Sequence, residues 1–340
     1  MKPKYLKTIG IKTNQPVGRG FLFPYDVTFD SSGMIYALNR GRISQGLGTR
    51  IQIFDYDEEW YGEFGEGSGT GPLNFLIPVA TAFNSKDELF VSDEGAGEVK
   101  VFSQKGIPLY QVGGESGTWG CELMGPSGIA FDADDNLYVT ERSASRLTKI
   151  DGDGNVRYRV GEPGDGHLQF NMPWGIATDE DGCVYVADWR NDRIQKLDPD
   201  GNFIKVFGKS GNAEGHFNRP SSVAVDGSGN MYVTDWGNER VQVLDPEGHF
   251  LQILEGQATL SKWAEQWLTV NPDEYSARRS SNLSVLDLPA HLQSPYQIGS
   301  QTEHLFWGPV SAKIDDHERL YITEHSRARI QVFDISDKGL

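Results

Sequence analysis

Short runs of alternating apolar and polar residues recur along the chain, and turn sequences separate them. Between residues 173 and 208 the runs are GIATD, CVYVAD, RIQKLD and FIKVFG, and two of the turns are DEDG and DPDG. Alternation with a period of two is typical of strands that bury one face, and Asp- and Gly-rich turns are typical of hairpins. This stretch is therefore expected to form four consecutive antiparallel strands.

The same pattern occurs six times. Each copy opens on a proline: Pro24, Pro78, Pro126, Pro173, Pro220 and Pro309. Fifteen residues later, a short polar or acidic residue closes the second strand: Asn39, Asp93, Glu141, Asp188, Asp235 and Glu324. A repeat of about 47 residues with four strands per copy predicts an all-β fold, a six-bladed β-propeller.

The last copy encodes only three strands, and the N-terminus supplies the fourth. A glycine ends the fourth strand in five copies, and its counterpart in the sixth copy is Gly10 of KYLKTIG. We therefore expect residues 5–10 to pair with the strand around residues 330–333 and to close the ring. Residues 1–340 then form a single propeller domain.

The repeats resemble a known family. P-x-G-I-A-x-D, Y-V-x-D and R-I-Q followed by a D-x-D-G turn look like NHL repeats, most closely over residues 126–256. The resemblance implies a scaffold similar to that of the peptidyl-hydroxyglycine lyases, which hold zinc through histidines near the blade-opening prolines. Tyr, Val, Ser, Trp, Ser and Val follow those prolines here, so the zinc histidines are missing.

Related gluconolactonase-like propellers hold calcium through a glutamate and asparagines that line the channel. Asp26 is the one obvious candidate for such a ligand in this sequence. A divalent metal therefore has no clear ligand set, and the cofactor stays unknown.

The net charge, the apolar runs and the two cysteines limit which binding partners and which cellular compartment we expect. The formal net charge of −17 argues against nucleic acid, whose phosphates need a basic surface, and against anionic membranes. No apolar run approaches the roughly 18 residues of a membrane helix, and the N-terminus lacks the apolar core of a secretory signal. Cys121 and Cys183 fall on opposite faces of the expected propeller and are expected to be unpaired, which fits a cytoplasmic protein.

An insertion, residues 258–300, interrupts the repeat before the sixth copy. Its first part has apolar residues at helical spacing: Leu260, Trp263, Trp267 and Val270. The sequence Asn-Pro-Asp-Glu at residues 271–274 is typical of a second helix start. We expect the insertion to cover the channel mouth and to dock near Trp189 and Trp236. It is then either a fixed plug or a lid over a ligand site.

The residues expected around the mouth differ from blade to blade. One position after each strand-closing residue they are Arg40, Glu94, Arg142, Trp189, Trp236 and His325. Such variation is typical of a binding site and also of an unconstrained rim. Asp26 stands where the other copies have a small residue. It is therefore a general base or metal ligand, or else the ion-pair partner of Arg40 or Arg42.

Three functions remain open. The first is a lyase or hydrolase that acts on a small polar or anionic molecule, with Asp26, Glu94 and His325 moving protons. The other mouth residues would bind its substrate: Tyr25, Arg40, Arg142, Trp174, Trp189 and Trp236. The second function is a non-catalytic propeller that binds a protein or peptide, and the third is a ligand sensor. The mixed charges at the mouth and the insertion favour the first.

Overall fold

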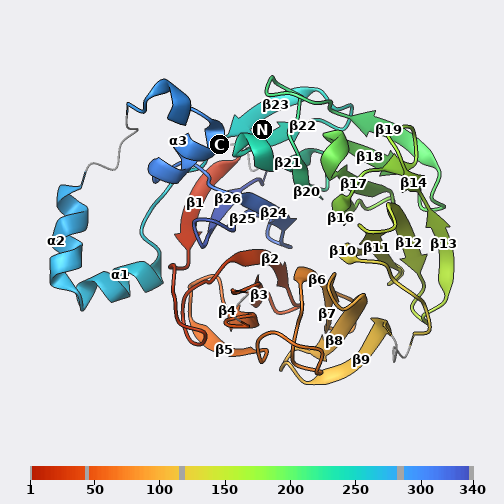
Figure 1. The fold of residues 1–340 in the computed structure, drawn as a ribbon, viewed down its shortest axis with the longest axis horizontal. Coiled ribbons are helices and arrows are strands. Elements are labelled where there is room, and N and C mark those ends of the chain that lie inside the picture. Colours follow the sequence, from red (N-terminus) through yellow and green to blue (C-terminus); the bar gives the residue numbers. More distant parts are fainter. Residues whose placement is uncertain (1, 43–45, 115–118, 282–286, 337–340) are drawn as a thin grey trace.

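Six four-stranded antiparallel sheets are arranged around a central axis (Figure 1). The computed structural model describes residues 2–42, 46–114, 119–281 and 287–336. Each sheet is one blade, and each blade begins at one of the six prolines identified in the sequence. The six-bladed β-propeller predicted from the repeat is therefore confirmed.

The strands of each blade run from the axis outwards in chain order. Blade one consists of β2 (Pro24–Phe29), β3 (Ile35–Asn39), β4 (Arg50–Phe54) and β5 (Trp60–Phe64). Blade two consists of β6 (Pro78–Phe83), β7 (Glu88–Asp93), β8 (Glu98–Ser103) and β9 (Pro108–Gly113). Blade three consists of β10 (Pro126–Phe131), β11 (Leu137–Glu141), β12 (Arg146–Ile150) and β13 (Val156–Val160). Blade four consists of β16 (Pro173–Thr178), β17 (Val184–Asp188), β18 (Arg193–Leu197) and β19 (Phe203–Phe207). Blade five consists of β20 (Pro220–Val225), β21 (Met231–Asp235), β22 (Arg240–Leu244) and β23 (Phe250–Leu254).

Blade six takes its outer strand from the N-terminus. It consists of β24 (Pro309–Ile314), β25 (Arg319–Glu324), β26 (Arg329–Asp334) and β1 (Lys4–Ile9). β1 pairs antiparallel with β26, with Tyr5 opposite Phe333 and Ile9 opposite Ile330. This is the pairing expected from the position of Gly10, and it removes an exposed sheet edge.

The hydrophobic core lies between neighbouring blades. The second strands β3, β11, β17 and β21 bury every residue, because each blade packs against a neighbour on both faces. A small parallel ladder, β14 (Glu162–Pro163) with β15 (Gln169–Phe170), lies in the link to blade four. Within the described residues no helix is both long and apolar enough to cross a membrane, and Cys121 and Cys183 are free thiols, as expected.

The acids that close the second strands fasten the blades to one another. In four blades the acid pairs with the arginine that opens the third strand: Glu141 with Arg146 (2.7 Å), Asp188 with Arg193 (2.8 Å), Asp235 with Arg240 (2.7 Å) and Glu324 with Arg329 (2.5 Å). The same carboxylates accept backbone amides from the link between blades, at Met124, Asn171, Asn218 and Trp307. This shared role explains why the position is acidic in most copies.

The insertion lies beside the ring (Figure 1). Its helices are α1 (Lys262–Thr269), α2 (Pro272–Ser280) and α3 (Pro295–Gln301), with a 3-10 turn η4 (Ala290–Leu292). α1 and α2 project outwards next to β1, and α3 packs near η3 (Trp236–Asn238) of blade five. The expectation that α1 and α2 cover the channel mouth is therefore wrong.

Trp263 determines where α1 docks. Its indole is 3% exposed and lies edge-on to Phe21 and Phe54, with ring centroids 5.7 and 5.3 Å away. These rings belong to the seam between blades one and six, so the helix docks there and not near Trp189 and Trp236. Of the four apolar residues expected to form one buried stripe, Trp267 and Val270 are 46% and 75% exposed.

The carboxylate of Glu58, in the turn between β4 and β5, holds the start of α1. It accepts the backbone amides of Lys262 (2.9 Å), Trp263 (3.5 Å) and Gly10 (3.2 Å). The Trp263 indole N–H donates to the Glu58 carbonyl oxygen at 2.7 Å. A carboxylate is favoured at a helix N-terminus, so Glu58 ties α1, β1 and blade one together.

Replacing Trp263 should therefore destabilise the whole ring. We expect Trp263→Ala to lower the free energy of unfolding by about 3–5 kcal/mol, because it leaves a large cavity in the seam. Trp267→Ala, on the exposed side of the same helix, should change it by no more than about 0.5 kcal/mol. Urea denaturation of both variants measures the difference, and equal losses would contradict this docking.

Candidate functional site

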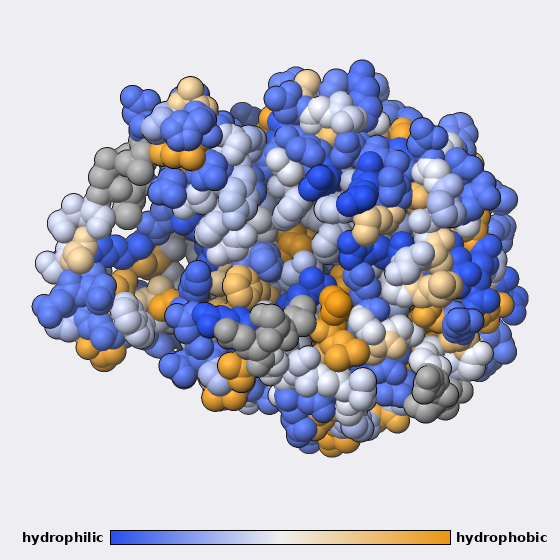
Figure 2. Space-filling view, viewed as in Figure 1, coloured by the Kyte–Doolittle hydropathy of each residue, from blue (hydrophilic) through white to orange (hydrophobic). Residues whose placement is uncertain are grey.

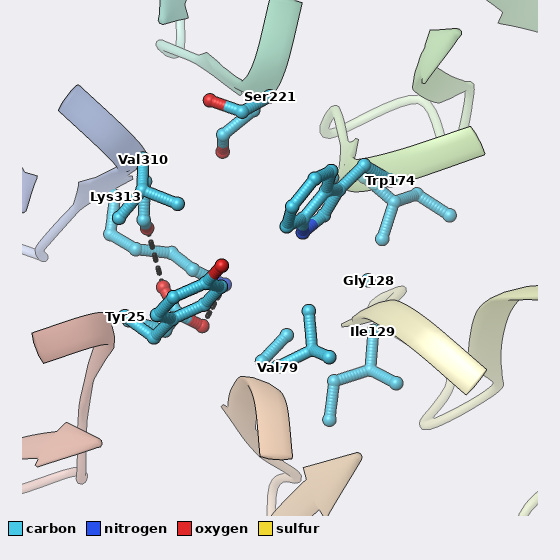
Figure 3. A pocket seen from close by; sticks show the side chains of 14 residues that line it. Tyr25, Val79, Gly128, Ile129, Trp174, Ser221, Val310 and Lys313 are labelled. Atoms are coloured by element: carbon cyan, nitrogen blue, oxygen red, sulfur yellow. Dashed lines mark hydrogen bonds and ion pairs between the residues drawn. The ribbon is translucent and has the colours of Figure 1, made fainter. Parts of the chain in front are cut away.

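Two aromatic side chains close the central channel. Tyr25 and Trp174 point from opposite inner strands towards the axis, with ring centroids 6.2 Å apart (Figure 3). The cavity they border has a volume of about 20 Å³, room for a single water molecule. A larger ligand beside Tyr25 and Trp174 must therefore lie outside the channel, on the face where the blade-opening prolines lie. We call this face the mouth.

Contacts connect the mouth residues predicted from the sequence. The His325 imidazole lies edge-on to Tyr25 at 5.2 Å, and the guanidinium of Arg40 lies 3.6 Å from the centre of the Tyr25 ring. On the other side of the axis, Trp174 contacts Trp189 at 5.6 Å. Trp189 in turn lies 6.3 Å from Trp236. One continuous aromatic network thus crosses the mouth.

Arg142 joins this network to a carboxylate. Its Nη1 lies 2.7 Å from Oε1 of Glu94, and its guanidinium lies 5.4 Å from the centre of the Trp174 ring. The ion pair is partly exposed, with 23% and 16% of the two side chains accessible. Glu94 is therefore already engaged in holding Arg142.

Two further arginines at the mouth were not among the predicted residues. The guanidinium groups of Arg190 and Arg219 lie 5.6 and 5.2 Å from the Trp189 ring, and that of Arg142 lies 6.0 Å from it. The repeat alone did not select Arg190 and Arg219, although each directly adjoins a predicted mouth residue or a blade-opening proline. Their position makes this side of the mouth basic within a strongly acidic chain.

Two buried hydrogen-bond donors at the same place have no acceptor. Among the described residues, neither the indole N–H of Trp189 nor the Nε–H of Arg142 has a partner. The Trp189 side chain is only 9% exposed. A buried donor without an acceptor costs about 1–3 kcal/mol, so an acceptor from outside the chain would relieve this cost.

Asp26 lies deeper, in the channel, and is 2% exposed. Its carboxylate accepts the Thr81 amide at 2.8 Å and the Ser311 hydroxyl at 2.5 Å, and it lies 3.5 Å from the Lys313 ammonium. Lys313, and not Arg40, is thus its ion-pair partner. Arg40 instead donates from Nε to the Pro78 carbonyl at 2.9 Å.

These channel residues do not fit a calcium site of the gluconolactonase-like kind. The Lys313 ammonium already supplies positive charge beside Asp26, and the other side chains around the cavity are apolar, small or hydroxylic. Among the described residues, one group has three ligand-type side chains close together: Asp245, Glu247 and His249. It lies in the hairpin between β22 and β23, and none of its residues is among those predicted for the site.

Burial sets the protonation of the mouth residues. It lowers the pKa of His325 to about 4, and the charge of Arg40 contributes in the same direction. Burial also raises the pKa of Tyr25, where the charges of Arg40 and Glu94 act in opposite directions. At neutral pH the imidazole is therefore neutral and the phenol is protonated.

Two family models match parts of the chain. The SMP-30/Gluconolactonase/LRE-like region matches residues 86–208, and the NHL repeat matches residues 217–244. The search of curated proteins found no significant relative.

Three solved structures are similar over nearly the whole chain. A streptogramin B lyase has 13% identity and a TM-score of 0.58, and covers 98% of each chain. The virginiamycin B lyase of Staphylococcus aureus has 16% identity and a TM-score of 0.55 over 99% of this chain and 89% of its own. A Bacteroides thetaiotaomicron protein of unknown function has 15% identity and a TM-score of 0.60 over 98% and 75%.

Identities this low establish a shared fold and nothing about the reaction. The two family matches fall on blades two to four and on blade five. The chain is therefore a six-bladed β-propeller, parts of which are similar to the NHL repeat and to the SMP-30/gluconolactonase/LRE-like region.

Proposed function

We propose that the mouth binds a small anionic molecule. The observation that carries this proposal is the pair of buried donors without acceptors, Trp189 Nε1 and Arg142 Nε, inside a group of guanidinium ions. A carboxylate or phosphate group bound beside them would offset the positive charge, and its oxygens would accept from the two donors once side-chain movement exposed these buried nitrogens. Hydrogen bonds to ionised groups are the stronger ones, so one anionic group is enough to give useful affinity.

The aromatic side chains suit the rest of such a molecule. Tyr25 and Trp174 form the floor, because the channel beneath them has no room for a ligand. Trp236, which is partly exposed, offers apolar contact beside the arginines. An open mouth of this kind requires no lid, which agrees with the position of α1 and α2 outside the ring.

A second candidate function is proton transfer at the mouth, and His325 favours it. Its imidazole is neutral at pH 7 and lies beside Tyr25 and Arg40, where it can accept a proton from a bound molecule. Asp26 and Glu94 suit this role less well, because each carboxylate already faces a cation. Lyase or hydrolase chemistry would therefore depend on His325.

Anion binding at the mouth can be tested with conservative variants. Trp189→Phe removes the indole N–H, and Arg142→Lys removes Nε–H but keeps the charge that faces Glu94. We expect each to weaken binding of succinate, citrate or inorganic phosphate by about five- to tenfold, the loss of one hydrogen bond. Tryptophan fluorescence titration measures the affinity.

The matched controls are Trp267→Phe and Arg157→Lys, which change exposed side chains outside the mouth. Both should bind as the unmodified chain does. If the mouth variants bound all three anions as tightly as the controls, the anion site would lie elsewhere.

The protonation of His325 predicts a pH dependence of stability. Between pH 6.5 and 4 the unfolded chain binds a proton at this residue and the folded chain does not, so stability falls as the pH falls. Lowering the pH from 8 to 5 should therefore cost about 2 kcal/mol more in the unmodified chain than in His325→Gln. Urea denaturation at the two pH values measures this difference.

His291→Gln, in the exposed turn η4, is the control and should keep the full pH dependence of the unmodified chain. An unchanged pH dependence in His325→Gln would show that this imidazole titrates normally, and it would remove the case for proton transfer.

A further inference from the structure

A hollow lies between blade six and the helical arm, formed by α1, α2 and the end of α3 (Figure 2). Its volume is about 420 Å³, within the range of about 300–1,000 Å³ that is usual for small-molecule sites. Residues 8–12 and 327–329 form one wall, and the arm forms the other. None of the mouth residues described above lines this hollow, so it is a separate feature.

The charged side chains around the hollow are mostly cationic: Lys12, Arg278, Arg327 and Arg329. Glu303 is the one carboxylate that lines it, and it pairs with Arg278. Arg329 pairs with Glu324 behind the wall. Among the described residues, neither Lys12 nor Arg327 lies within ion-pair distance of a carboxylate, although Glu324, Glu303 and Glu239 are near enough to act on the charge of Arg327.

Burial of Arg327 raises the free-energy cost of keeping its guanidinium charged. One side-chain nitrogen, Nη2, donates to the carbonyl oxygens of Gly299 and Thr302, whereas Nε is buried without an acceptor. The guanidinium lies 5.8 Å from the centre of the Trp307 ring. Burial, followed by the charge of Arg329, lowers the pKa of Arg327, which reflects the same cost. A partly buried cation of this kind is normally stabilised by an anion.

We propose that this hollow binds a small molecule with a carboxylate or phosphate group, held between Lys12 and Arg327. The anionic group would neutralise Arg327, and the ammonium of Lys12 would face it from the strand side. Glu303 would repel the ligand weakly, because its charge is already offset by Arg278. The insertion then serves as one wall of a binding site at the outer edge of the propeller, independent of the mouth.

Isothermal titration of the full chain with inorganic phosphate and with citrate tests this proposal. We expect Lys12→Gln and Arg327→Gln each to weaken binding by about tenfold, because each removes one ionic contact. Glu303→Gln should strengthen binding, since it removes the repelling carboxylate. Lys86→Gln, which makes the same change of charge at an exposed hairpin on another blade, should leave the affinity as it is. Phosphate and citrate together identify which anionic group is preferred.

Repeating the titrations in the Trp189→Phe chain separates this site from the mouth. Only the binding that Lys12→Gln weakens should keep its affinity there, whereas binding at the mouth should be weaker. Because Arg327 also holds α3, circular dichroism must show that Arg327→Gln is folded. The Lys12 and Glu303 variants test the site without removing that contact. The proposal is overturned if neither anion binds with a Kd below about 1 mM. It is also overturned if Lys12→Gln and Glu303→Gln bind as Lys86→Gln does.

Discussion

The ladder between β1 and β26 is the contact on which the rest of the propeller depends. It joins the first strand of the chain to the last, and thereby turns six sheets in a row into a closed ring. Because each blade buries both faces against neighbours, an open ring would expose one face of blade one and one of blade six. Glu58 and Trp263 strengthen the same seam through α1.

The sequence was sufficient to predict the ring, because a repeat reports the same local structure six times. The period-two alternation, the opening prolines and the displaced Gly10 each had one consistent interpretation. The insertion occurs once and offers no such check. Helical spacing placed Trp263 and Trp267 in one stripe, but only Trp263 packs against Phe21 and Phe54 in the seam between blades one and six, whereas Trp267 is exposed.

At the mouth, the sequence predicted which positions face it but not how they pair. The variable position after each strand-closing residue did lead to side chains that contact one another between neighbouring blades, Trp189 with Trp236 and Arg142 with Glu94. Pairings between blades far apart in the sequence could not be predicted: Lys313 of blade six pairs with Asp26 of the neighbouring blade one. Arg190 and Arg219 were missed because nothing in the repeat distinguishes a guanidinium that stacks on Trp189 from one in solvent.

The contacts that hold α1 also matter for folding during synthesis, because the ribosome makes the chain from its N-terminus. β1 is made first, but its partner β26 is made last, so β1 must wait through the synthesis of five blades. The hydroxyl of Ser261 donates to the Gly10 carbonyl at 2.6 Å, and Glu58 binds the Gly10 amide. Once residues 261–263 emerge, α1 can thus hold the end of β1 against blade one. The nascent chain would then keep its closing strand in place, sheltered from pairing with other chains, until blade six arrives.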